Sequence, residues 1–114
     1  MLKMEAVEMS NTSADSTARK IDTLIAIGAG KIIDNTLNKL INYQLAKYRN
    51  NIKQIKQELE KFENHYDMSS DVFYQSFEAG NLGDEGDFFE WSGLYENILL
   101  YEERIKMIEP LIST

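Results

Sequence analysis

Residues 41–66 read INYQLAKYRNNIKQIKQELEKFENHY, and this stretch decides the fold. Large apolar side chains recur in it at alternating intervals of four and three residues: Ile41, Leu45, Tyr48, Ile52, Ile55, Leu59, Phe62 and Tyr66. Polar and charged residues occupy most of the positions between them. A repeat that averages about 3.5 residues is typical of a long amphipathic helix that packs along one edge against another helix. We therefore predict one long helix from about residue 31 to residue 66.

A second apolar stripe with the same spacing follows near the C-terminus: Trp91, Leu94, Ile98, Tyr101, Ile105 and Ile108. Asp87, followed three residues later by Glu90, resembles a capping box and predicts the start of this helix. Pro110 is expected to close it. Between the two long helices, we predict a short helix that begins after an N-cap at Ser69 or Ser70 and ends at Gly80 in a left-handed conformation.

Two long helices with matching stripes predict an all-α fold, a long antiparallel helical hairpin of coiled-coil type with a short helix in the connection. At about 1.5 Å per residue the first helix is ~54 Å long and the last ~35 Å. The last helix can therefore cover the first only back to about residue 44. The apolar arm before that point has no partner within the chain unless residues 21–30 fold back over it, and an uncovered apolar arm usually binds a second chain. We predict a dimer through the four residues of this arm, Ile33, Leu37, Leu40 and Ile41.

The N-terminal region carries a weaker pattern. Residues 1–15 are polar and without period, which predicts a flexible tail, and residues 16–114 are expected to form a single helical-hairpin domain. The sequence of residues 16–33 is compatible with either a helix or a strand. Ile21, Leu24, Ile25 and Ile32 fit a helical stripe. Gly28 and Gly30 lower helix propensity, and the β-branched run also suits a strand. We favour the helix.

The block from Phe62 to Glu103 contains no Lys or Arg, yet it holds eleven of the 19 carboxylates and ten of the 12 aromatic side chains. Aromatic rings are normally buried, whereas carboxylates stay in water unless a basic group meets them. We expect a packed aromatic mini-core beside an acidic surface that favours a basic partner. The predicted partner-binding residues combine aromatic anchors with acidic neighbours: Tyr74, Asp84, Glu85, Asp87, Phe89 and Glu90.

Composition limits the other functions. The chain has no cysteine, which excludes thiolate metal sites and favours a reducing, cytoplasmic location. Its net charge of -7 argues against nucleic-acid binding by this chain alone, and no apolar run is long enough for a membrane span. His65, the single histidine, is expected to be a surface residue rather than a catalytic base. The acidic loop lacks the ligand spacing of a calcium site. We predict no catalytic residue, no metal and no cofactor.

Residues 62–105 resemble a family of small, poorly characterised prokaryotic helical proteins. The resemblance rests on a Met-Ser-Ser-acid-x-Phe element, a Phe-Glu-x-Gly-x-Leu-Gly-Asp element and an Asp-Phe-Phe-Glu-Trp element, which here are residues 68–73, 77–84 and 87–91. Where the family has Gly before the Met, this chain has Asp67, which predicts a left-handed aspartate there. Such genes often resemble the smaller member of a toxin and antitoxin pair. The resemblance implies an inhibitor that binds a small, basic, ribonuclease-like toxin.

Three functions therefore stay open, and the least favoured is an enzyme, because the residues that catalysis requires do not converge. The other two are binding functions. One is an antitoxin-like inhibitor that binds a protein partner without catalysis. The alternative is a homo-oligomeric coiled-coil scaffold without a toxin partner. A small basic open reading frame next to this gene favours the first, and an isolated gene favours the second.

Overall fold

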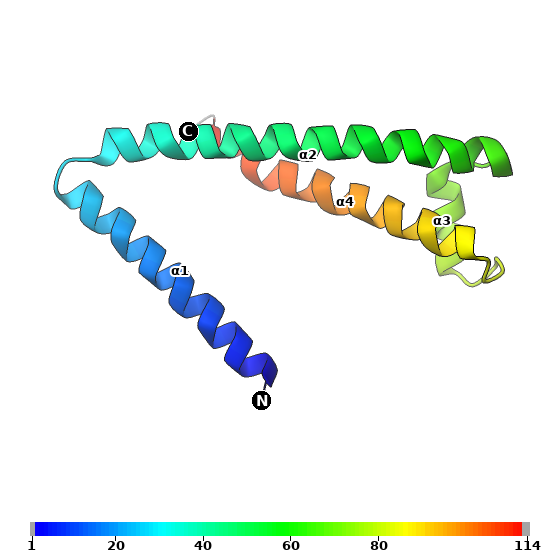
Figure 1. Cartoon of the computed structure of the whole chain (residues 1–114), viewed down its shortest axis with the longest axis horizontal. Coiled ribbons are helices and arrows are strands. Elements are labelled where there is room, and N and C mark those ends of the chain that lie inside the picture. The colour runs from blue at the N-terminus through cyan, green and yellow to red at the C-terminus, as the bar shows by residue number, and fades with distance from the viewer. Residues whose placement is uncertain (1, 113–114) are drawn as a thin grey trace. The chain divides into compact units, whose positions relative to one another are not determined.

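The computed structural model describes the backbone of residues 2–112 and the side chains of residues 13–112. The described chain is all-α, with helices α1 (Leu2–Ala26), α2 (Gly30–Tyr66), α3 (Ser70–Glu78) and α4 (Gly86–Ile112), as labelled in Figure 1. It divides into two compact units, residues 1–40 and residues 41–114. Helix α2 contributes its first turns to one unit and the rest of its length to the other.

The second unit is the predicted antiparallel hairpin. Near the C-terminal end of α2, Phe62 stacks on Trp91 from the start of α4, with ring centroids 5.6 Å apart. Further back along α2, Tyr48 stacks on Tyr101 at 5.4 Å. Residues earlier in α2 thus contact residues later in α4. The two helices therefore run in opposite directions, as Figure 1 shows. The all-α hairpin with a short helix in its connection is confirmed.

Burial along α2 shows where the hairpin packing stops. Leu59 and Leu45 are 5% and 3% exposed, whereas Leu40 is 53% exposed. Helix α2 has 37 residues and α4 has 27, so the length difference expected from the sequence is present. An ion pair between Arg49 and Glu109 lies near this end of the hairpin. The apolar face of α2 therefore continues beyond the part that the hairpin buries.

The ambiguous residues 16–33 form the end of one helix, a turn and the start of the next. Gly28 has φ of 97°, and its N–H donates to the Ile25 carbonyl at 3.0 Å. The N–H of Ala29 donates to the Leu24 carbonyl at 2.9 Å. These two bonds form a Schellman motif, which ends a helix on a left-handed glycine. The favoured helical prediction is confirmed over residues 16–26, and Gly28 explains why it is interrupted.

The other two interior helix ends follow the same rule. Gly80 has φ of 76°, and its N–H and that of Asn81 close a second Schellman motif after α3. Asp67 has φ of 51° after α2, and the N–H of Met68 donates to the Glu63 carbonyl at 3.2 Å. The predicted left-handed residues at 67 and 80 are both confirmed. An aspartate is tolerated in this conformation because its side chain is short and polar.

Two predicted helix ends are wrong. Helix α4 begins at Gly86, so Asp87 lies inside the first turn instead of capping it. Its carboxylate accepts a hydrogen bond from the Tyr66 hydroxyl at 2.7 Å, a contact made across the hairpin. Pro110 lies within α4, which continues to Ile112. A proline removes one backbone hydrogen bond, but a helix can continue past it for a few residues.

Helix α1 includes much of the region for which the sequence predicts a flexible tail, residues 1–15. The side chains of residues 1–12 lie outside the described residues. The predicted tail and its boundary with a domain at residue 16 stay predictions.

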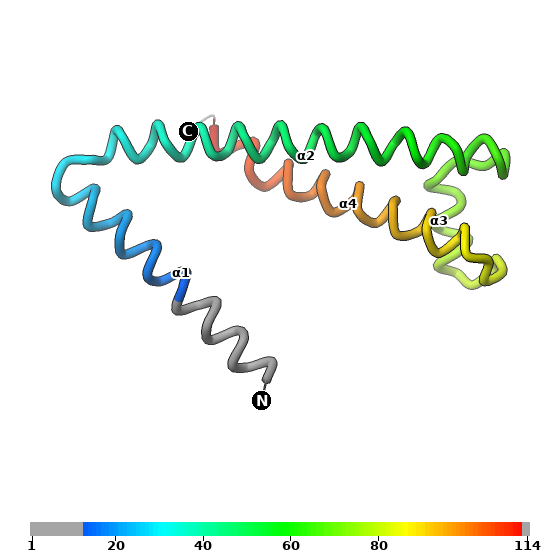
Figure 2. Tube along the Cα trace, viewed as in Figure 1, coloured from blue at the N-terminus to red at the C-terminus, as the bar shows by residue number. Residues whose placement is uncertain are grey.

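The core of the second unit lies where three helices meet. Figure 2 shows α3 linking the end of α2 to the start of α4. Four buried side chains from these helices form one cluster: Leu59, Phe73, Trp91 and Ile98. Half-buried apolar side chains pack around it, including Phe62, Tyr66, Tyr74, Phe77, Phe88 and Tyr95. The aromatic mini-core predicted from the sequence is therefore present at this end of the hairpin.

Candidate protein-binding surface

Trp91 is the centre of the aromatic end of the hairpin. Its side chain is 0% exposed, as is that of Phe73. The two rings stack almost in parallel, with centroids 3.8 Å apart and an interplanar angle of 3°. Phe62 and Tyr66 of α2 stack on the same indole at 5.6 and 5.7 Å. Rings packed in this way contribute area burial and an additional stacking energy, so this end is a rigid base for any surface built on it.

A short chain of hydrogen bonds ties the three helices together at the same place. The Trp91 Nε1–H donates to Ser70 Oγ at 2.9 Å, and Ser70 Oγ donates to Glu63 Oε2 at 2.7 Å. The backbone N–H of Ser70 donates to the same oxygen at 3.0 Å. Ser69 takes the N-cap position of α3, but its side chain makes no capping bond. Glu63 instead supplies the acceptor for the first N–H of α3, a role that local sequence patterns do not reveal.

Tyr66 and Asp87 form the edge of this core. The hydrogen bond to the Asp87 carboxylate, with burial and the negative charges of Asp87 and Glu85, raises the pKa of Tyr66 to about 12. The same bond holds the Asp87 side chain against α2. Asp87 is thus a structural contact at the rim rather than a freely rotating carboxylate.

The two predicted aromatic anchors have different environments. Phe89 is 60% exposed. Its ring and the ring of Phe77 are arranged edge to face, with centroids 5.5 Å apart and an interplanar angle of 89°. Tyr74 is half-buried, its ring packs on Tyr95 at 5.0 Å, and its hydroxyl donates to Glu96 at 3.0 Å. Burial and then the Glu96 bond raise the pKa of Tyr74. Phe89 is the open anchor, and Tyr74 supports the core.

The acidic residues around Phe89 lie on the turn before α4 and on its first two turns. Asp84, Glu85, Asp87 and Glu90 are all exposed. Asp87 and Glu90 line a pocket together with Lys61, Phe62 and His65 of α2, so these two carboxylates face α2, whereas Phe89 meets Phe77 of α3. His65, at the end of α2, is exposed and packs edge-on against Tyr66 at 4.7 Å.

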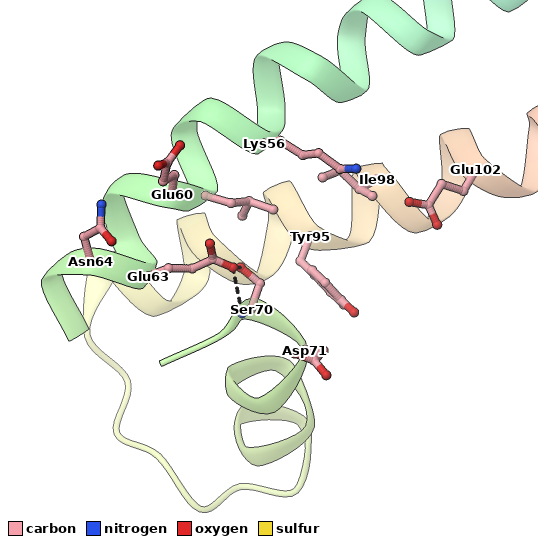
Figure 3. A pocket seen from close by; sticks show the side chains of 10 residues that line it. Lys56, Glu60, Glu63, Asn64, Ser70, Asp71, Tyr95, Ile98 and Glu102 are labelled. Atoms are coloured by element: carbon pink, nitrogen blue, oxygen red, sulfur yellow. Dashed lines mark hydrogen bonds between the residues drawn. The ribbon is translucent and has the colours of Figure 1, made fainter. Parts of the chain in front are cut away.

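A groove that the sequence did not reveal lies on another side of the same end. It has a volume of about 550 Å³ and is shown in Figure 3. Residues from α2, α3 and α4 line it: Lys56, Leu59, Glu60, Glu63, Asn64, Ser70, Asp71, Tyr95, Ile98 and Glu102. A hydrogen bond from the Ser69 hydroxyl lowers the pKa of Asp71. Burial, and then the negative charges of Asp71 and Glu102, raise the pKa of Tyr95. The groove is lined by carboxylates, one lysine and one tyrosine. These residues come from three helices, so their proximity depends on how the helices pack.

The predicted dimer residues lie around the boundary between the two units. Leu37 is 38% exposed and Leu40 is 53% exposed, while Ile33 and Ile41 are half-buried. Tyr43, which follows them on α2, is 64% exposed. Two of the four predicted residues are thus open to solvent and two are partly covered, and the dimer stays a prediction.

Searches for related proteins and for other kinds of site complete the description. No family model, curated protein or solved structure matches this chain. Within residues 2–112 no helix is long and apolar enough to cross a membrane. Among the described side chains, those of residues 13–112, no three His, Asp or Glu residues are grouped in a way that suits a metal ion. The resemblance of residues 62–105 to small prokaryotic helical proteins stays a prediction.

Proposed function

We propose that this chain is a non-catalytic protein-binding module, an antitoxin-like inhibitor of a small basic toxin. One observation carries the proposal. Of the ten aromatic side chains between Phe62 and Glu103, Phe89 alone is exposed, at 60%. The exposed carboxylates Asp84, Glu85 and Glu90 lie within five residues of it in the sequence. An apolar ring surrounded by charge has the composition of an interface hot spot with a polar rim.

The position of Phe89 follows from the helix. It precedes the buried Trp91 by two residues, and residues two apart on a helix point to nearly opposite sides. Burying Trp91 therefore turns Phe89 outward, where only the edge of Phe77 supports it. A partner that covers the ring removes its apolar surface from water, which favours association.

The charge around the ring favours a basic partner. The block from Phe62 to Glu103 has eleven carboxylates and no Lys or Arg. Such a field raises the rate at which a basic protein meets the surface, and it weakens with salt. That the partner is a toxin is inferred by analogy with the gene pairs of the family that residues 62–105 resemble. We propose that both proteins are located in the cytoplasm.

A homodimer through the arm of α2 is the second part of the proposal, supported by the exposure of Leu37 and Leu40. The same observation favours the alternative function, a homo-oligomeric scaffold with no toxin partner. A scaffold does not require Phe89 or its acidic neighbours, so variants at the aromatic end distinguish the two functions.

Where a small basic open reading frame adjoins this gene, co-expression of its product with this chain in a bacterial host tests the proposal. We expect that the product slows growth and that the wild-type chain restores it. Phe89→Ala combined with Asp84→Lys and Glu90→Lys should abolish the rescue. These two carboxylates are chosen because Asp87 holds Tyr66 and its reversal would disturb the fold.

The matched control is Asp22→Lys with Asp34→Lys, which makes the same change in net charge on exposed residues of the first unit. It should rescue growth as the wild type does. Retained rescue by the Phe89 variant contradicts the proposal. Loss of rescue only in the control moves the binding site to residues 20–45. Circular dichroism of each variant confirms that the helices are intact.

A further inference from the structure

Helix α4 has apolar side chains on two faces. Its inner face packs on α2 and α3 through Trp91 and Ile98, which are 0% and 5% exposed. On its outer face Leu100 is 40% exposed and Met107 is 66% exposed. Because each residue turns a helix by about 100°, Leu100 lies on nearly the opposite side from Ile98. A helix of one hairpin needs only one apolar face to pack on its neighbour.

The outer residues form a row. Gly93, Leu100 and Met107 recur every seven residues, the spacing that places side chains in line along a helix. At Gly93 an added Cβ would meet nothing within 4 Å, so the row is open there and another backbone can approach closely. Phe89 precedes Gly93 by four residues and continues the row to the proposed anchor. We call Phe89, Gly93, Leu100 and Met107 the outer row.

Carboxylates accompany this row. Glu96 and Glu103 are also seven residues apart, both are exposed, and each lies one helical turn from Leu100. One oxygen of Glu96, Oε1, accepts the Tyr74 hydroxyl of α3 at 3.0 Å, and no side chain among residues 13–112 donates to the other oxygen. The Arg104 guanidinium lies 5.9 Å over the Tyr48 ring, directed at α2 rather than at the row. The outer row is therefore an apolar line bordered by a parallel acidic line.

We infer that the outer row docks an amphipathic helix of the partner protein, with the partner's apolar side against Leu100 and Met107 and its Lys or Arg residues against Glu96 and Glu103. The inference rests on the proposed function and names the element that the partner supplies. Two lines that each repeat every seven residues match the side chains of a second helix, and an extended strand has a different repeat. The acidic line selects a basic helix over an acidic one.

Synthetic peptides of about three heptads test this without the natural partner. One is an amphipathic helix of Leu and Lys, and its twin has Glu in place of every Lys. Fluorescence anisotropy of labelled peptide at about 0.15 M salt should show that the full-length chain binds the Leu–Lys helix and not its twin. Leu100→Ser with Met107→Ser should weaken binding about tenfold or more, because two exposed side chains lose the apolar area that docking buries.

The matched control is Leu24→Ser with Ile32→Ser, which replaces two exposed aliphatic residues of the first unit, 42% and 70% exposed. It should bind the Leu–Lys helix as the wild type does. Equal binding of both peptides, or unchanged affinity in the Leu100 and Met107 variant, overturns the inference. So does sedimentation in which that variant turns a wild-type dimer into a monomer, because a second copy then occupies the row.

The growth assay separates this inference from the proposed function. If the variant with Phe89, Asp84 and Glu90 replaced loses rescue while Leu100→Ser with Met107→Ser retains it, the docking inference fails and the proposed function stands. If the Leu–Lys helix binds the outer row but no variant of the aromatic end affects rescue, the proposed function fails by itself.

Discussion

Replacing Ser70 with alanine tests how the buried end of the hairpin is held together. Trp91 is fully buried, and its Nε1–H donates to Ser70 Oγ at 2.9 Å. Ser70→Ala leaves this donor without its partner, and an unsatisfied buried donor costs about 1–3 kcal/mol. Glu63 still accepts the backbone N–H of residue 70, so α3 keeps its first bond. We expect the free energy of unfolding to fall by about 1–3 kcal/mol.

A second substitution isolates the hydrogen bond. Trp91→Phe keeps an aromatic ring against Phe73 but has no N–H to donate. Ser70→Ala should therefore cost less in the Trp91→Phe background than in the wild type, by about 1–2 kcal/mol. This difference is the coupling energy that a double-mutant cycle measures between residues in contact.

Urea unfolding followed by far-ultraviolet circular dichroism gives the four free energies. Fluorescence cannot be used for all of them, because Trp91 is the single tryptophan. If Ser70→Ala costs the same in both backgrounds to within about 0.3 kcal/mol, the bond contributes nothing to stability and the reasoning is refuted.

The remaining predictions concern the rim, the anchor and the arm. Since folding raises the pKa of Tyr66 from 10.0 to about 12, its contribution to stability is complete below pH 10.0 and lost as the pH rises towards 12. Asp87→Asn should lower the pH at which the tyrosinate absorbance of Tyr66 appears. An unchanged absorbance titration contradicts this prediction. Phe89→Ala should cost no more than about 1 kcal/mol in urea unfolding because the ring is already 60% exposed, and a much larger loss would make it a core residue. Leu37→Asp with Leu40→Asp should give monomers in sedimentation, whereas a wild type that is already monomeric at tens of micromolar excludes the predicted dimer.

Local patterns in the sequence were sufficient for the helices and most of their ends. The apolar repeat in residues 41–66 predicts α2 because a long stripe must be covered by a second helix. Gly80 and Asp67 predict left-handed helix ends because few other residues adopt that conformation at low cost. The burial of Trp91 follows from its place in the stripe of α4. These features depend on residues close to one another in the chain.

Local sequence patterns do not predict contacts between segments that are far apart in the chain. Glu63 and Ser70 meet Trp91 only when α3 has its observed orientation, and no spacing encodes that angle. The sequence predicts Asp87 as a cap because Glu90 follows it by three residues, and no local pattern shows that its partner Tyr66 lies 21 residues earlier. The outer row lies on the opposite side of α4 from the stripe through Trp91, so that stripe does not predict Leu100 and Met107.

The most direct test of the account is the rate at which the proposed partner, a small basic protein, associates with the acidic aromatic end. Stopped-flow mixing of the purified chains at low salt and at about 0.5 M salt measures that rate and its salt dependence. We predict that Asp84→Lys with Glu90→Lys slows association and flattens the salt dependence, because exposed charges act mainly on encounter. Phe89→Ala should instead speed dissociation. If both variants associate and dissociate as the wild type does, the aromatic end is not the binding surface.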